Sequence, residues 1–274
     1  MNLIAIDEQK CKRDGICVAE CPIKILTMKT PESFPQPVPG ADELCINCGH
    51  CVAVCPHGAL QHRNMGAEDC PDVRREWLLG PEQAEHFLRN RRSFRTFKDK
   101  IVDREILSRL VGVAAYAPSG HNRQPVHWMI LHDKAELKRL TGLVVDWMRY
   151  MVKEQPAMAG PMHLDMIVGA WEAGVDVVCR DAPHLILAHG DKTDPTTQAS
   201  CTIAMTYLEL ATQPFGLGAC WAGYFNVAAT FWPPMQKALA LPEKHGSFGA
   251  MMIGYPKYQY HRLPLRREAR ITWR

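Results

Sequence analysis

Four cysteines and a proline, in the order Cys45-x2-Cys48-x2-Cys51-x3-Cys55-Pro56, constrain this chain more than any other part of its sequence. The two short gaps let one loop wrap three corners of a cubic iron–sulfur cluster, and the spacing is that of a bacterial-type ligand run. Thiolates are soft ligands that suit such clusters. We call residues 45–56 the second run, because a related run precedes it.

The first run, Cys11-x2-Asp14-x2-Cys17-x3-Cys21-Pro22, keeps the same frame but has Asp14 at the position of the second cysteine. Two such runs in one short region indicate one-electron chemistry. In two-cluster ferredoxins the fourth cysteine of each run ligates the cluster of the other run. The expected ligands are Cys11, Asp14, Cys17 and Cys55 for a first cluster, and Cys45, Cys48, Cys51 and Cys21 for a second.

Two alternatives stay open for these runs. Zinc is the other candidate metal, since paired CxxC segments often bind it, although the x2, x2, x3 spacing before Cys-Pro fits an iron–sulfur run better. Asp14 either ligates the fourth iron of the first cluster and leaves a labile corner, or it is a spectator beside a three-iron cluster. A carboxylate is a harder ligand than a thiolate, so both interpretations predict two spectroscopically different clusters.

Composition narrows the classes of protein to which the chain can belong. Its 274 residues suggest about two domains, and a formal net charge of +3 is too small to indicate a nucleic-acid partner. No apolar run approaches the ~18 residues needed to span a bilayer, and the N-terminus lacks the pattern of a signal peptide. Seven of the 11 cysteines stand in the two runs, which favours a reducing interior. We therefore expect a cytoplasmic protein with no membrane partner.

The sequence divides into three parts, which we expect to be an iron–sulfur domain at 1–66, a connector at 67–90 and a second domain at 91–274. Few apolar residues precede residue 66, so cluster assembly should be part of folding there. After residue 66 the pattern becomes separated helices and strands, which predicts an α+β fold. Helices are expected at 73–79, 82–90, 103–115 and 199–213, and strands at 126–131, 184–188 and 251–254.

Four segments of the second domain stand out. They are the arginine block at 90–97, the polar loop at 116–125, the glycine-rich segment at 216–224 and the C-terminal segment at 260–264. The arginine block could bind an anion, because guanidinium groups form bidentate contacts with phosphate. Gly216-x-Gly218 does not continue as a dinucleotide motif, because Trp221 stands at the third glycine position.

Together and in this order, the four segments resemble the nitroreductase family of FMN flavoproteins, from about Arg91 to Arg262. The N-terminal part resembles two-cluster bacterial ferredoxins, so the chain looks like a fusion of the two. The resemblance implies a flavodomain with a mostly antiparallel central sheet, in a homodimer that binds one FMN at each end of its interface. It assigns no catalytic side chain.

The resemblance also implies FMN contacts, residue by residue. Arg95 is the candidate cation at the N1–O2 edge of the ring. The block that contacts the phosphate, the ribityl chain and the pyrimidine side is Arg91, Arg92, Ser93 and Arg95. The loop that reaches the flavin from the partner subunit is Pro118, Ser119, Gly120 and Asn122. The pair beside N5 is Ala222 and Gly223, and Arg262 contacts the phosphate.

Some features depart from the family pattern or stay open. Ala222 stands where many relatives carry an acidic residue, and Arg180 is a guess for a further cation near the ring. Trp221 and Tyr224 either narrow a substrate pocket or, as we favour, belong to the core. Cysteines outside the runs are expected to be buried at Cys179, Cys201 and Cys220, and Cys70 is expected to be an exposed thiol.

These expectations describe a cytoplasmic iron–sulfur flavoenzyme. Reduced ferredoxin or a similar low-potential donor would load the clusters, which pass electrons to FMN and then to a small electrophile such as a nitroaromatic, a quinone or an activated alkene. One alternative is a ferredoxin-linked flavin reductase or electron-transfer module without a specific organic substrate. Another is a redox sensor that uses a labile first cluster.

Overall fold

A computed structural model describes residues 2–274 and divides into two compact units. The first unit contains the chain up to Leu78 together with His121–Arg123. The second contains Leu79–Gly120 and Gln124–Arg274. Among the described residues, no helix is both long and apolar enough to cross a membrane.

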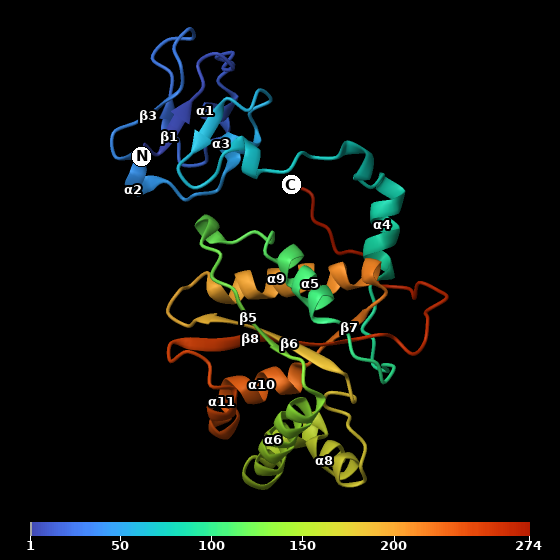
Figure 1. The fold of residues 1–274 in the computed structure, drawn as a ribbon. Helices are drawn as coiled ribbons and strands as arrows, with labels where there is room; N and C mark the ends of the chain where they lie inside the picture. Colours follow the sequence, from blue (N-terminus) through green and yellow to red (C-terminus); the bar gives the residue numbers. More distant parts are fainter. Residues whose placement is uncertain (1) are drawn as a thin grey trace. The chain divides into compact units, whose positions relative to one another are not determined.

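The first unit is built from short elements around the two cysteine runs (Figure 1). β1 pairs antiparallel with β4, which joins the two ends of the region, and β2 pairs with β3. Two 3-10 turns follow, at Ala67–Asp69 and Arg75–Trp77. The elements are β1 (Ile4–Ile6), α1 (Ile16–Glu20), β2 (Leu26–Thr27), β3 (Gln36–Pro37), α2 (Ala41–Leu44), α3 (His50–Ala53) and β4 (Leu60–His62).

The two runs have the same local geometry. Gly15 precedes α1 and Gly49 precedes α3, and both have φ of 71°. Residues with a Cβ rarely adopt this left-handed conformation, so a glycine at this point lets each ligand loop turn into its helix. The core beneath them is small; its fully buried members include Ile25, Leu26 and Leu60. A core of this size supports the expectation that a metal centre stabilises the unit.

The second unit is built on one antiparallel sheet with the strand order β5-β6-β8-β7. The strands are β5 (His127–Leu131), β6 (His184–Asp191), β7 (Gly218–Trp221) and β8 (His245–Gly254). β6 and β8 are the central pair, and seven of the eight residues of β6 are buried. This burial follows from helices on both faces, which cover both sides of the central strands, so that even the polar His184 and His189 of β6 are buried.

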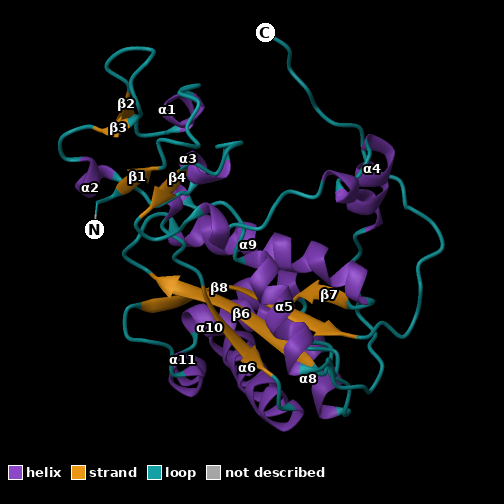
Figure 2. Cartoon of the chain, turned by 45° about the horizontal axis from the view of Figure 1, so that its top comes forward, coloured by secondary structure: helices purple, strands orange, loops and turns teal. Residues whose placement is uncertain are grey.

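Helices cover the two faces of this sheet (Figures 1 and 2). One face carries α5 (Arg104–Ala114) and α9 (Thr197–Thr212), and the other carries α6 (Lys134–Glu154), α8 (Leu164–Glu172), α10 (Gly223–Phe231) and α11 (Pro233–Leu239). The remaining helices are α4 (Pro81–Asn90) and α7 (Pro156–Ala159), with 3-10 turns at Gly120–Asn122, Gly160–Met162 and Gln213–Phe215. The two helical layers enclose two apolar clusters, one on each face of the sheet.

The structure confirms the α+β class and the mostly antiparallel sheet, and corrects several element bounds. The helix expected at 73–79 is only a 3-10 turn, because exposed residues such as Leu78 and Leu79 have no core to pack against. The strand expected at 251–254 begins at His245, because pairing with β6 extends it through two glycines. α6 was not predicted from the sequence; the carboxylate of Asp133 caps it by accepting from Ala135 N and Glu136 N.

Candidate functional site

Two cavities in the first unit each collect side chains from both cysteine runs. The first cavity is lined by Cys11, Asp14, Cys17 and Cys55, with Lys12 and His57. The second cavity is lined by Cys45, Cys48, Cys51 and Cys21, with His62. The fold therefore brings each ligand set expected from the sequence to one place, including the exchange of Cys21 and Cys55 between the runs.

Burial favours the neutral form of one thiol in each cavity, Cys51 in the second and Cys17 in the first. Burial, together with the nearby Cys48, Cys21 and Cys45, raises the pKa of the Cys51 thiol to about 11. Burial also raises the pKa of Cys17, with Cys55 adding to the effect. Several thiolates held this close together repel one another unless positive charge lies between them. The donor sets thus fit iron–sulfur clusters, whose iron ions supply that charge.

Polar groups differ between the two cavities. In the second, His62 Nε2 lies 3.4 Å from Cys45 Sγ, and burial lowers the pKa of this imidazole. In the first, Asp14 Oδ1 accepts from Ile16 N at 3.2 Å, while Asp14 Oδ2 lies 4.0 Å from His57 Nε2. Sequence reasoning missed His57. This residue lies near Asp14 only because Cys55, two residues earlier, lines the first cavity although it belongs to the second run.

In the second unit, the arginine block lies along β7. Phe94 N donates to Ala219 O at 2.9 Å, and Ser93 forms a parallel bridge with Ala219. The Phe94 ring lies over Gly218, where an added Cβ would be only 2.5 Å from Phe94 Cγ. This contact requires glycine at position 218, because a side chain there would collide with the ring. The arginine block and the glycine-rich segment therefore pack against each other and form one surface.

Arg91 has a partner that the sequence did not indicate. Its Nη1 lies 2.6 Å from Oε1 of Glu209 on α9, and the side chain of Glu209 is only 6% exposed. The other carboxylate oxygen, Oε2, accepts from Trp221 Nε1 at 3.3 Å. Glu209 therefore joins the arginine block to the segment that begins α10, and the FMN contact expected of Arg91 stays a prediction.

Arg92 retains an unused donor. Its Nε is buried and has no hydrogen-bond partner within the part of the chain that the structure describes. Its guanidinium group stands over the ring of Tyr260 at 5.4 Å, and this ring packs edge-on against Phe94 at 5.2 Å. The C-terminal segment thus returns to the arginine block, and the exposed Arg262 follows two residues after Tyr260. A buried donor without a partner fits an anionic ligand at this place.

Positive charge gathers near Cys220 on β7. Burial raises the pKa of this thiol, while the charges of Arg95 and Arg180 act against the rise. Arg95 also donates from Nη1 to Ser93 O at 3.5 Å. Two of the cations considered from the sequence therefore act on the same thiol, one from the arginine block and one from the turn before β6.

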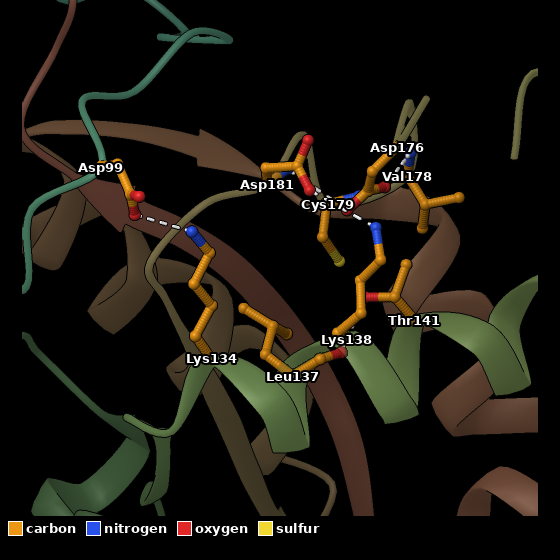
Figure 3. A network of polar contacts seen from close by, with 9 residues as sticks. All are labelled: Asp99, Lys134, Leu137, Lys138, Thr141, Asp176, Val178, Cys179 and Asp181. Atoms are coloured by element: carbon orange, nitrogen blue, oxygen red, sulfur yellow. Dashed lines mark hydrogen bonds and ion pairs between the residues drawn. The ribbon is translucent and has the colours of Figure 1, made fainter. Parts of the chain in front are cut away.

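The turn that carries Arg180 is held by a buried carboxylate (Figure 3). Asp176 accepts from Val178 N and Cys179 N at 2.9 Å, and from Asp181 N at 3.2 Å. Arg180 and Asp181 have φ of 58° and 49°, a left-handed conformation that residues with a Cβ rarely adopt. Such a conformation persists only where surrounding contacts enforce it, and the three bonds to Asp176 do so.

The other expected FMN contacts lie in three places. Ala222 is buried, and its N donates to Ala250 O at 2.8 Å, whereas Gly223 is exposed with open space where a side chain would begin. Pro118 and Ser119 line a separate cavity beside the end of α5, and Gly120 follows them. Asn122 belongs to the first unit. The first of these places adjoins the arginine block, which lies along β7.

The remaining aromatic and sulfur side chains belong to the packing. Trp221 and Tyr224 are partly buried against the two apolar clusters, which agrees with the core interpretation. Cys179, Cys201 and Cys220 are buried, as expected. Cys70 is half-buried rather than exposed, because it packs against the core of the first unit.

Comparison with known proteins matches the two parts of the chain separately. A model of the Nitroreductase family matches residues 88–255, and a model of the 4Fe-4S dicluster domain matches residues 9–60. A protein of Archaeoglobus fulgidus with the provisional name NADH dehydrogenase/NAD(P)H nitroreductase is 24% identical over 176 residues, which cover 64% of this chain and 87% of that protein.

Two further relatives concern the separate units. Ferredoxin 7Fe of Hydrogenibacillus schlegelii is 32% identical over 57 residues, which cover 21% of this chain and 67% of the ferredoxin. The crystal structure of a nitroreductase with bound FMN from Bacteroides fragilis superimposes with a TM-score of 0.55 and 19% identity, covering 69% of this chain and 95% of that one. At this identity the superposition shows the fold alone.

The buried carboxylate generates a prediction about stability. We expect Glu209→Ala to lower the free energy of unfolding by about 3–5 kcal/mol, because it leaves the partly buried Arg91 and the indole N–H of Trp221 without their acceptor. Glu85→Ala is the matched control, since Glu85 pairs with Arg89 on the surface of α4, where both side chains are 63% exposed. Its cost should stay below about 1 kcal/mol. Denaturant unfolding of both variants checks this, and equal shifts would contradict it.

Proposed function

We propose that this protein passes electrons through two clusters to FMN and on to a small electrophile. The chain belongs to the Nitroreductase family and carries a 4Fe-4S dicluster domain before the nitroreductase region. The observation that carries the proposal is the pair of cavities in the first unit. Each collects the four side chains that a cluster needs, and they stand in the same chain as a fold whose relatives bind flavin.

The two clusters have different ligand sets in this proposal. The second cluster is a 4Fe-4S cluster on Cys45, Cys48, Cys51 and Cys21, and the first is held by Cys11, Cys17 and Cys55 with Asp14 at its remaining corner. The name Ferredoxin 7Fe supports one complete and one three-iron cluster in that relative. By that analogy, the corner beside Asp14 is the one that loses its iron on oxidation.

FMN is proposed to bind along the arginine block and the start of α10. FMN accepts electrons singly and delivers them in pairs, which joins one-electron clusters to two-electron chemistry. Arg92 supplies an unused buried donor for the phosphate, Arg95 supplies positive charge near the ring, and Gly223 offers open space for the ring to approach. The proposed contacts are Arg91, Arg92, Ser93, Arg95, Ala222, Gly223 and Arg262, with Pro118, Ser119, Gly120 and Asn122 from the partner subunit.

The wider setting of this activity is also a proposal. A homodimer supplies the loop residues of the partner subunit, and a reduced ferredoxin or similar low-potential protein in the cytoplasm is the donor. Nitroaromatics, quinones and activated alkenes are the acceptors, because each is flat enough to stack on a flavin and accepts electrons as hydride. The clusters give this chain an electron input that does not depend on NAD(P)H.

The exchange of cysteines between the runs can be tested by removing one at a time. We expect Cys21→Ser to abolish the second cluster and to leave the first, because Cys21 lines the second cavity although it stands in the first run. Cys55→Ser should do the opposite. Low-temperature EPR of the reduced proteins distinguishes the two clusters.

Cys70→Ser is the control for these variants, since Cys70 lines neither cavity. It should keep both signals. If Cys21→Ser instead removes the first cluster, each run holds its own cluster and the exchange is wrong.

The flavin assignment predicts an effect at Arg92. We expect Arg92→Ala to raise the Kd for FMN by roughly 10- to 100-fold, because a charge-assisted hydrogen bond contributes about 1.5–3 kcal/mol. Arg92→Lys should recover only part of this, since an ammonium lacks the guanidinium fork. Arg139→Ala, which breaks a surface pair within α6, should bind FMN normally. Titration of FMN fluorescence measures all three, and an unchanged Kd for Arg92→Ala would contradict the assignment.

The whole electron path is tested by a cofactor inventory followed by single turnover. Anaerobically purified protein should contain iron, sulfide and one FMN per chain. After photoreduction, mixing with a nitroaromatic, a quinone or an activated alkene should reoxidise the flavin rapidly and give product in proportion to flavin. Absence of FMN would refute the proposal. Release of free reduced FMN without product would favour the flavin-reductase alternative instead.

A further inference from the structure

We infer that Asn122 is a positioning residue of the second cluster. Its side-chain amide holds the ligand loop between Cys45 and Cys48 and raises the reduction potential of the cluster bound there. The inference rests on the second cluster proposed above. It gives a role in the first unit to a residue that stands in the polar loop at 116–125, far from both cysteine runs in the sequence.

The contact is a pair of hydrogen bonds to main-chain oxygens. Asn122 Nδ2 donates to Asn47 O at 2.9 Å and to Ile46 O at 3.3 Å. These partners stand 75 and 76 residues earlier in the chain, between the first two cysteines of the second run. His121–Arg123 accordingly belong to the first unit, although the residues before and after them belong to the second. The amide therefore holds the main chain of the ligand loop itself.

The backbone around Asn122 indicates that this contact is enforced. His121, Asn122 and Gln124 have φ of 51°, 51° and 48°, which lie in the left-handed region. Residues with a Cβ rarely adopt this conformation, and it persists only where surrounding contacts hold it. One such contact is the bond from Gln124 N to Ser119 Oγ at 3.0 Å. The bonds from Asn122 to the ligand loop are the others.

The two bonds act on peptide groups of the loop that lines the second cavity. A peptide group whose oxygen accepts a hydrogen bond is polarised, and its N–H becomes a stronger donor. The N–H groups concerned are those of Asn47 and Cys48, and within the described residues neither donates to a main-chain acceptor. Ile46 and Cys48 both line the cavity. N–H groups that donate to cluster sulfur stabilise the added electron, so stronger donors raise the reduction potential.

The first run provides an internal comparison. Lys12 and Arg13 stand where Ile46 and Asn47 stand in the second run, and Arg13 has φ of 59° where Asn47 has 52°. The two ligand loops therefore share one local conformation. In the part of the chain that the structure describes, no side chain donates to Lys12 O or Arg13 O. The amide of Asn122 thus distinguishes the second loop from the first, and its effect should be confined to the second cluster.

A redox titration of the cluster- and FMN-loaded protein, followed by low-temperature EPR, tests the inference. Asn122→Gly removes the amide without straining the main chain, since glycine adopts positive φ freely. We expect the one-electron reduction equilibrium of the second cluster to become about 3- to 10-fold less favourable, which is roughly 30–60 mV toward more negative potential. The potential of the first cluster should stay at its wild-type value.

Asn64→Ala is the matched control. Asn64 Nδ2 also donates to this loop, at 2.8 Å, but its acceptor is the side-chain oxygen Oδ1 of Asn47, so the peptide groups keep their partners. Both potentials should remain unchanged in this variant. Asn122→Asp keeps the size of the side chain and replaces the donor with negative charge. It should lower the potential of the second cluster by more than Asn122→Gly does.

The outcomes separate this inference from the proposed function. A wild-type potential of the second cluster in both Asn122 variants would overturn the inference, as would an equal shift of both clusters or the same shift in Asn64→Ala. If the Asn122 variants raise the Kd for FMN but keep the cluster potentials, the residue serves the flavin alone and the inference is wrong. These results would leave the proposed function standing. If the wild-type protein shows no iron–sulfur signal, the proposed clusters fail together with the inference.

Discussion

The exchange of one cysteine between the two runs is the constraint on which the first unit depends. Each cavity takes three side chains from one run and a fourth from the other, so neither run can complete its site alone. The pairing of β1 with β4 draws the ends of the region together and makes this exchange possible. Because the apolar core of the unit is so small, we expect the proposed clusters to stabilise it, so that folding and metal uptake would be one process.

The second unit depends on a different kind of contact. Glu209 is buried on α9 and holds Arg91 and Trp221, which come from opposite ends of the surface formed by the arginine block and β7. Removing either partner of such a pair leaves an uncompensated charge in a poorly solvated place. The arrangement therefore fixes the relative position of the two segments, and an anionic planar cofactor would meet a surface that is already assembled.

Sequence reasoning predicted those features that are determined by residues close together in the chain. The cysteine spacing reflects the geometry of a cluster, and the periodicity of α5 and α9 reflects one buried face, so both were visible in short windows. β7 was missed, because it is short, begins with a glycine of low strand propensity, and becomes a strand only by pairing with β8. Glu209 stands 118 residues from Arg91, and His57 meets Asp14 only through the exchange of Cys55, so no short pattern indicates either contact.

The turn at Asp176 has a consequence for how any ligand is received. Its carboxylate already satisfies three main-chain N–H groups, and Arg180 is held in a conformation that few side chains adopt freely. The backbone entropy needed to order this turn was therefore lost when the chain folded. A ligand that reaches Arg180 meets a main chain that is already ordered, so only the arginine side chain has to be ordered on binding and no loop has to close.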